Sequence, residues 1–239
     1  MNLNEISTWN LQFSKRIIRA NQHNGFISAV IEAERGYGKS MYALKNMAYA
    51  YHILLECDEN DAYTHALNSM IFSPKELIDR VTVNSANDEV SIVWCIDDAT
   101  VHFSSYLHFL NLYEAALLNG MFDTIRTSVS SLILTCPNKK RLLSSLKTYD
   151  DHTIQITKDY GYERIARGIK WFTIPDGTRR YRKVFEDEFS CYVPNWIYKL
   201  YLKKRKKYLV EISLKLKELQ AKMERKRSKK DVVLMSTSA

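Results

Sequence analysis

The chain contains few residues of the kinds that interrupt or cross-link a fold. Its 239 residues include seven glycines, four prolines and four cysteines. Scarce glycine and proline leave little room for long linkers without secondary structure, and an apolar fraction of 46% is enough for a sizeable core. These proportions exclude a globally disordered chain and predict a compact α/β or α-rich body.

Cysteine pairs and long apolar runs are also absent from the sequence. The four cysteines are far apart and form no C-x-x-C motif, which argues against a zinc site or a disulfide framework and favours reduced thiols. The sequence has no apolar N-terminal segment typical of a secretory signal and no run of eighteen uncharged apolar residues. We therefore expect a soluble, cytoplasmic protein with no membrane partner.

The excess positive charge of the chain lies in one C-terminal segment. Residues 196–230 include fourteen lysines and arginines and three glutamates, a net charge of +11, whereas the rest of the chain has a net charge of −3. A basic segment attached to a mildly acidic body is typical of nucleic-acid-binding proteins. The alternative is a lysine-rich helix whose charges only face solvent.

Strand-like and helix-like patterns alternate along the first two thirds of the chain. Apolar, β-leaning runs predict strands at residues 26–32, 70–72, 90–96, 130–135 and 152–157. Helical periodicity and capping residues predict helices from Ser7 or Thr8 to Ala20, over 39–56, from Ser73 onward, over 105–128 and over 139–148. Such alternation favours a parallel sheet with helical crossovers.

Residues 33–40, AERGYGKS, lie between a predicted strand and a predicted helix. They depart from the Walker A pattern G-x-x-x-x-G-K-[ST] only at Ala33, where the first glycine is expected. Backbone N–H groups at a helix N-terminus bind phosphate, and Gly36 and Gly38 provide the positive φ angles that such a loop needs. Lys39 is predicted to reach the β- and γ-phosphates and Ser40 to bind Mg²⁺. The predicted nucleotide-binding residues are Glu34, Arg35, Gly36, Tyr37, Gly38, Lys39, Ser40 and Met41.

Two aspartates follow the predicted strand 90–96. A nucleotide-bound Mg²⁺ needs a carboxylate at the end of a neighbouring strand, and Asp97 is in that place as a Walker B acid. Asp98 is then predicted to polarise the attacking water. The alternative is a strand end with two solvated aspartates. Together with the loop, these residues predict ATP and Mg²⁺ as cofactors.

Three further residues are candidates for catalysis. Thr135 ends the predicted strand 130–135, where a polar side chain can sense the γ-phosphate, although a threonine in a plain turn fits equally well. An arginine that acts on a neighbouring subunit would make activity depend on oligomerisation. Arg126 and Arg141 are the two candidates, and a homo-oligomer is expected.

The last part of the chain has a hairpin pattern followed by one long basic helix. Pro175-Asp176-Gly177 separates two β-rich runs, and residues 195–228 have helical composition, followed by a frayed tail. Basic side chains near the hairpin tip could enter a DNA groove or line a pore, and those of the helix could bind phosphates. The predicted nucleic-acid contacts are Arg179, Arg180, Arg182, Lys203, Lys204, Arg205, Lys206 and Lys207.

Four segments together resemble a known family: NGFISAVIEAERGYGKSMYALK, WCIDDA, LILTCPN and VPNWIYKLYLKKRKKY. They are similar to the DnaA-like P-loop ATPases of archaeal spindle-shaped viruses (fuselloviruses) and of related plasmids, over about residues 10–215. The resemblance implies a three-layer α/β P-loop NTPase, RecA/AAA-like and of the additional-strand class. It also implies ATP-driven work on DNA in replication initiation or genome handling, in the host cytoplasm if the protein is viral. By its motifs, the resemblance implies a Walker A lysine and Mg²⁺-binding serine at Lys39 and Ser40. It also implies a Walker B pair at Asp97 and Asp98 and a γ-phosphate sensor at Thr135.

The chain departs from an AAA+ initiator in two respects. A β-hairpin and one basic helix stand where a helical lid with a second sensor arginine is expected, and no helix-turn-helix pattern occurs. The choice between an AAA+, a RecA-like and a packaging-motor-like ATPase therefore stays open. We expect three parts: an ATPase core over 1–158, a hairpin extension over 159–194 and a basic helix and tail over 195–239.

The predicted function is a Mg²⁺-dependent ATPase that remodels or moves duplex DNA. Two alternatives within this class are a nucleotide-switched DNA-binding protein with little turnover and a viral DNA-packaging motor. A third is a phosphotransferase that acts on a small molecule, against which the basic C-terminal segment argues.

Overall fold

A computed structural model describes residues 11–102, 119–142, 144–147, 149, 151–158 and 163–236. The chain divides into two compact units, Met1–Ile197 and Tyr198–Ala239. The second unit consists of most of one helix, α10 (Asn195–Ser236). The first unit contains the sheet and the other described helices.

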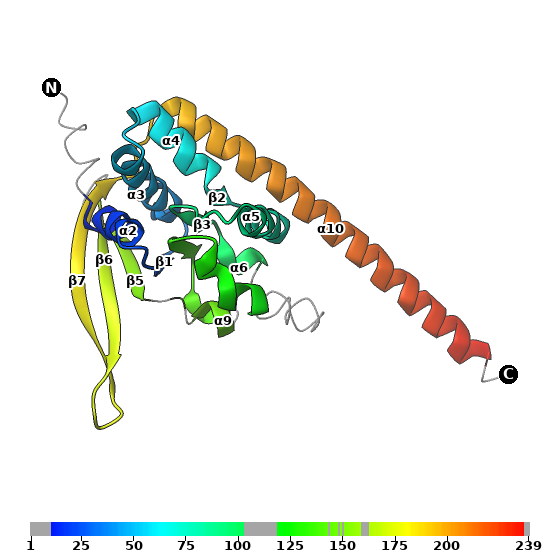
Figure 1. Ribbon diagram of the computed structural model, residues 1–239. Coiled ribbons are helices and arrows are strands. Elements are labelled where there is room, and N and C mark those ends of the chain that lie inside the picture. Colours follow the sequence, from blue (N-terminus) through cyan, green and yellow to red (C-terminus); the bar gives the residue numbers. More distant parts are fainter. Residues whose placement is uncertain are drawn as a thin grey trace. The chain divides into compact units, whose positions relative to one another are not determined.

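The first unit is built on one mixed sheet of seven strands in the order β2-β3-β4-β1-β5-β6-β7 (Figure 1). Five strands are parallel to one another: β1 (Ile27–Glu32), β2 (Met70–Ile71), β3 (Trp94–Ile96), β4 (Ser131–Cys136) and β5 (His152–Lys158). The predicted parallel sheet is thus confirmed. The predicted hairpin is β6 (Glu163–Thr173) and β7 (Arg179–Ser190), which pairs antiparallel with β5 and extends the same sheet.

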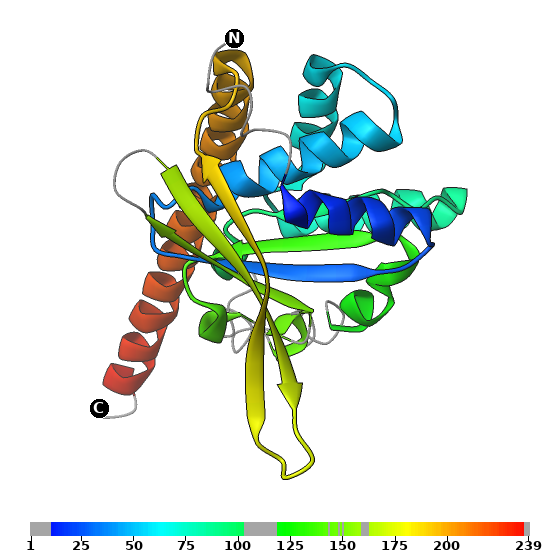
Figure 2. The same cartoon turned by 90° about the vertical axis from the view of Figure 1, so that its left-hand side faces the viewer.

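Helices cover both faces of the sheet. Figure 2 shows α2 (Gln12–Gln22) and α3 (Lys39–Leu54) on one face and the short α9 (Ser144–Lys147) on the other. The remaining described helical elements are α4 (Glu59–Asn68), α5 (Pro74–Asn87), α6 (Ala99–His102) and two 3₁₀ turns, η1 (Ile125–Thr127) and η2 (Lys139–Arg141). The arrangement is compatible with a three-layer α/β fold.

Because side chains alternate along each strand, the two faces of the sheet carry different side chains. Trp94, Ile96 and Leu134 belong to a buried apolar cluster on one face, together with Phe122 and Leu146. Successive side chains of a strand point to opposite faces, so Thr135, and Asp97 just after β3, lie on the other face, which α3 covers. This parity is the reason that polar groups from two strands can reach the start of α3.

Several predicted boundaries were wrong, each for a local reason. The predicted helix over 139–148 is broken into η2 and α9, because Leu142 between them is extended and fully buried. Strand 90–96 is reduced to β3, and Ser91 forms only an isolated bridge with Val129. The long helix does not end near 228 but continues to Ser236, since no glycine or proline interrupts it.

Other boundaries depend on residues that the sequence alone could not connect. The start of the first helix at Ser7 or Thr8 lies outside the described residues, as does 103–118 within the predicted helix 105–128. The described α2 starts at Gln12, and the backbone N–H groups of Gln12 and Phe13 donate to the carboxylate of Asp187 in β7, at 2.6 and 3.2 Å. A carboxylate from a distant strand therefore caps this helix.

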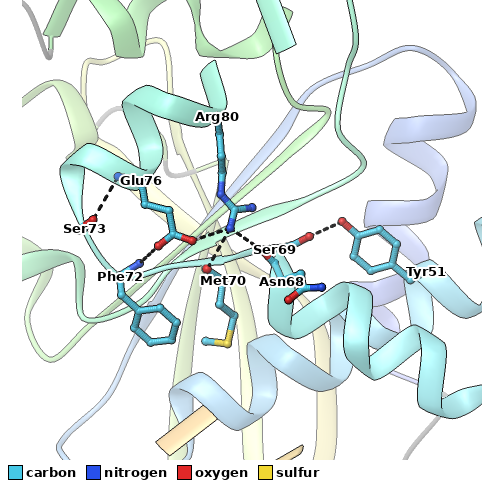
Figure 3. A network of polar contacts seen from close by, with 8 residues as sticks. All are labelled: Tyr51, Asn68, Ser69, Met70, Phe72, Ser73, Glu76 and Arg80. Atoms are coloured by element: carbon cyan, nitrogen blue, oxygen red, sulfur yellow. Dashed lines mark hydrogen bonds and ion pairs between the residues drawn. The ribbon is translucent and has the colours of Figure 1, made fainter. Parts of the chain in front are cut away.

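The two-residue strand β2 is held by side chains of the helix that follows it (Figure 3). Ser73 accepts a hydrogen bond from the Glu76 N–H at 3.1 Å, which confirms the predicted N-cap. The Glu76 carboxylate accepts from the Phe72 N–H at 3.0 Å and pairs with Arg80 at 2.7 Å, and Arg80 also donates to the Met70 carbonyl at 3.4 Å. These contacts fasten the edge of the sheet to α5.

Candidate nucleotide-binding site

Residues 33–38, here called the glycine loop, connect the carboxyl end of β1 to α3. The predicted strand–loop–helix context is therefore confirmed. Gly36 has φ +79° and Gly38, the N-cap of α3, has φ +87°. Both angles lie in the region that side chains disfavour, as the sequence predicted. Glu34 and Arg35 are exposed, Tyr37 is half-buried and Met41 is buried.

Gly38 is required for a second reason that the sequence did not indicate. A Cβ atom built on Gly38 would lie 2.3 Å from the Cys191 Sγ and 3.5 Å from the Phe189 ring. Cys191 directly follows β7, so the base of the hairpin packs on the start of α3. The contact joins the glycine loop to the antiparallel part of the sheet.

Gly38→Ala should lower the free energy of unfolding by about 2 kcal/mol or more, because strain at positive φ adds to a steric clash. Gly36→Ala is the matched control, since its φ is also positive but no atom lies within 4 Å of the added Cβ. In a Cys191→Ala background the cost of Gly38→Ala should fall toward that of Gly36→Ala. Denaturant titrations of Gly38→Ala, Gly36→Ala, Cys191→Ala and the double variant Gly38→Ala/Cys191→Ala measure this coupling. An identical cost of Gly38→Ala with and without Cys191 would contradict the contact.

Lys39 begins α3, and its ammonium group lies within the curve of the glycine loop. The side chain is 7% exposed, and Nζ donates to the Ala33 and Glu34 carbonyl oxygens at 2.8 and 2.9 Å. The loop therefore holds a positive charge at the N-terminus of α3. Such a combination favours an anion at the helix N-terminus.

Ser40, Asp97 and Thr135, here called the Asp97 cluster, meet at the start of α3. Ser40 Oγ donates to Asp97 Oδ1 at 2.6 Å, and Thr135 Oγ1 donates to the same oxygen at 2.8 Å. Asp97 is 2% exposed and Thr135 is fully buried. Three residues that lie 38 to 95 positions apart in the sequence thus converge, as their predicted roles require. A hydroxyl and a carboxylate are the oxygen ligands that Mg²⁺ prefers.

Asp98 is tied to the same cluster through its backbone. Its N–H donates to Thr135 Oγ1 at 2.9 Å, and its φ is +48°, an uncommon value for a residue with a side chain. The side chain is half-buried. The left-handed turn after β3 therefore fixes the position of Asp98 beside the Asp97 cluster.

Basic side chains from outside the motifs also lie near the glycine loop, and the sequence analysis missed them. Lys45, on α3, donates to Ser190 Oγ at 3.2 Å, and burial lowers its pKa to about 8. Lys158, the last residue of β5, places Nζ 4.7 Å from the centre of the Tyr37 ring. Burial raises the pKa of the Cys191 thiol, against the nearby charges of Arg164, Lys45 and Lys158. No local pattern marks these residues, because the hairpin pairing brings them together.

A buried junction behind the glycine loop joins α2, α3 and β7. The Tyr42 hydroxyl donates to Asp187 Oδ2 at 2.6 Å, the same carboxylate that caps α2. Burial, and then the charge of Asp187, hold the pKa of Tyr42 well above its usual range, while burial raises the pKa of Asp187. Tyr42 is therefore a neutral donor, and the junction fixes α3 against the hairpin.

The two candidate arginines occupy opposite edges of the sheet. Arg141, in η2, follows the carboxyl end of β4 and so lies on the edge that carries the glycine loop, whereas Arg126, in η1, precedes the amino end of β4. Both side chains are exposed. Of the two, Arg141 is the one on the edge that carries the glycine loop, and action on a neighbouring subunit stays a prediction for both.

The predicted nucleic-acid residues belong to the hairpin and to α10. Arg180 and Arg182 are exposed on the hairpin, and the side chain of Arg179 lies outside the described part. On α10, Lys203, Lys206 and Lys207 are exposed, whereas Lys204 and Arg205 are half-buried. Among the residues that the structure describes, no helix is both long and apolar enough to cross a membrane.

Comparisons with known proteins place similar chains in archaeal viruses. No protein-family model matches the chain. It is 27% identical to the uncharacterized protein B-251 of Sulfolobus spindle-shape virus 1 over 227 residues, which cover 92% of this chain and 89% of that protein. It is 28% identical to the uncharacterized protein ORF286 of Acidianus two-tailed virus over 131 residues, 54% of this chain and 43% of the other. The viral context that the resemblance implies is thus supported, and neither name states an activity.

Proposed function

We propose that the chain is a Mg²⁺-dependent P-loop ATPase that couples ATP binding and hydrolysis to remodelling or movement of duplex DNA in the host cytoplasm. The observation that carries the proposal is the convergence of Ser40 and Thr135 on Asp97 at the end of the glycine loop. If the glycine loop were a decayed or accidental motif, the carboxylate of Asp97 after β3 and the hydroxyl of Thr135 in β4 would not be expected to meet at the start of α3.

The strand order supports the same class. β4 lies between β1, which leads into the glycine loop, and β3, which leads into Asp97. An additional strand between these two is the feature after which the additional-strand class is named. The antiparallel β6–β7 hairpin then follows β5 where an AAA+ initiator is expected to have a helical lid. This difference favours a RecA-like or packaging-motor-like member of the class.

Each residue of the site has a distinct part in the proposed hydrolysis. The backbone N–H groups of residues 36–40 and the Lys39 ammonium bind and orient the β- and γ-phosphates. Ser40 and Asp97 would hold Mg²⁺, which neutralises charge on the phosphate oxygens. Asp98 accepts the proton of the attacking water, and Thr135 holds Asp97 and the Asp98 backbone in place.

Two basic segments support DNA as the partner. Residues 196–230 carry a net charge of +11, and Arg180 and Arg182 are exposed on the hairpin. Lysine and arginine neutralise DNA phosphates irrespective of base sequence. A phosphotransferase that acts on a small molecule does not require basic segments of this kind.

A nucleotide-switched DNA-binding protein with little turnover is the second candidate. Asp98 favours it, because its side chain is one methylene shorter than the glutamate usual at this position and its backbone is fixed at φ +48°. In that case ATP sets the affinity for DNA, and hydrolysis contributes little.

Phosphate release by the full chain, with and without DNA and over a range of protein concentrations, separates the two candidates. We expect DNA to stimulate hydrolysis and the rate to rise more than linearly with protein if an arginine acts between subunits. Asp98→Asn should reduce turnover roughly 10²-fold or more, whereas Asp88→Asn, at an exposed aspartate with φ +55°, should leave it unchanged. Equal turnover of the native chain and Asp98→Asn, with ATP-dependent DNA binding, would favour the switch.

A further inference from the structure

Among the described residues, no third strand pairs with the distal part of the β6–β7 hairpin, which is a two-stranded ribbon. β5 pairs with β6 only from Arg164 to Ile169, whereas β6 and β7 remain paired from there to Thr173 and Arg179. Residues 170–182, here called the hairpin tip, project beyond the rest of the sheet (Figures 1 and 2). All described side chains of the hairpin tip are exposed except that of Ile174, which is half-buried. Both faces of the tip therefore carry exposed side chains.

Aromatic side chains occupy both faces of the hairpin tip. Trp171 lies opposite Tyr181 on one face, with ring centres 5.2 Å apart, and Phe172 lies opposite Arg180 on the other. Trp171, Phe172 and Tyr181 are 37%, 42% and 63% exposed. A cross-strand pair explains part of the Trp171–Tyr181 contact. It does not explain the exposure of the Phe172 ring or the large exposed area of Tyr181.

Basic residues accompany these rings. The tip contains Lys170, Arg179, Arg180 and Arg182 and one acidic residue, Asp176 at the turn, a net charge of +3. Phe172 and Arg180 are neighbours on one face, and Lys170 lies opposite Arg182 on the same face. Exposed aromatic rings beside cations bind single-stranded nucleic acids, in which unpaired bases stack on the rings and phosphates meet the charges. Bases within a duplex offer phosphates but no open ring faces.

We propose that the hairpin tip is a binding site for single-stranded DNA, in which unpaired bases stack on Phe172 on one face and on Tyr181 on the other. Arg180 and Arg182, on the face of Phe172, bind phosphates. The inference rests on the proposed function for its choice of DNA and deepens it. A protein that remodels duplex DNA exposes unpaired bases, and the tip holds one released strand.

The test is equilibrium binding of the full chain, without nucleotide, to three fluorescent probes of equal length: oligo(dT), an abasic oligonucleotide and a blunt duplex. We expect oligo(dT) to bind more tightly than the abasic probe. Phe172→Leu combined with Tyr181→Leu should weaken oligo(dT) binding roughly 10-fold to 100-fold and leave abasic binding unchanged. Tyr192→Leu, at a tyrosine that is 64% exposed outside the tip, is the matched control.

Salt dependence gives a second measurement that does not depend on the aromatic variants. Arg180→Gln combined with Arg182→Gln should reduce the slope of log affinity against log salt by about 1.4 for oligo(dT). Lys15→Gln combined with Arg19→Gln, at exposed residues of α2, removes equal charge and should leave the slope unchanged. Equal affinity of the native chain for oligo(dT) and abasic probes would overturn the proposal, as would a duplex preference that the aromatic variants leave intact. Because no nucleotide is present, these outcomes do not depend on whether the chain hydrolyses ATP.

Discussion

Lys39→Ala should reduce ATP hydrolysis by roughly 10²-fold to 10³-fold, the effect expected when one fixed charge on the transferred phosphate is lost. Lys39 Nζ lies within the glycine loop, 2.8 and 2.9 Å from two loop carbonyl oxygens, where the transferred phosphate is expected to bind. Single-turnover phosphate release at saturating ATP measures the change directly.

Lys140→Ala is the control for this experiment. Lys140 is exposed in η2, on the same edge of the sheet, so its removal changes the net charge equally. A melting curve shows whether either variant alters the fold. Comparable hydrolysis by the native chain and Lys39→Ala, with both folded, would mean that the glycine loop does not bind the reacting phosphate.

Asp97→Asn should reduce hydrolysis by a similar factor and weaken its dependence on Mg²⁺. Asp97 Oδ1 accepts hydrogen bonds from Ser40 and Thr135, and an asparagine oxygen can accept both. The replacement therefore keeps the hydrogen bonds and removes the charge that would hold the metal ion. The rate of phosphate release against Mg²⁺ concentration measures the effect.

Asp79→Asn provides the comparison, because Asp79 is an exposed aspartate of α5 outside the site. Its Mg²⁺ dependence should match that of the native chain. If Asp97→Asn also kept the native Mg²⁺ dependence, Asp97 would be only a structural acceptor for two hydroxyl groups.

Local sequence patterns were enough to predict the central part of the candidate site. The apolar runs before Ala33 and before Asp97 identify buried strands, and parallel strands bring their carboxyl ends to one edge of a sheet. The sequence alone therefore predicts that Ser40, Asp97 and Thr135 converge. In the structure, Ser40 and Thr135 both donate hydrogen bonds to Asp97 Oδ1.

The surroundings of the site could not be predicted in the same way. Cys191 meets Gly38 and Asp187 caps α2 across about 150 or more residues of sequence, through the pairing of β6 and β7 with β5. That pairing is long-range: local patterns predict the hairpin but do not show that it joins the sheet at β5. Leu142 likewise interrupts a good helical pattern because its burial in the core outweighs helix propensity.

The central claim is that the glycine loop and the Asp97 cluster bind a nucleoside triphosphate together with Mg²⁺. Equilibrium titration of the full chain with a non-hydrolysable ATP analogue, with Mg²⁺ and with a chelator, tests it most directly. We predict saturable binding that Mg²⁺ strengthens in the native chain, that Lys39→Ala weakens, and that Mg²⁺ no longer strengthens in Asp97→Asn. Absence of binding at millimolar analogue with Mg²⁺, or binding that both variants leave unchanged, would contradict the claim.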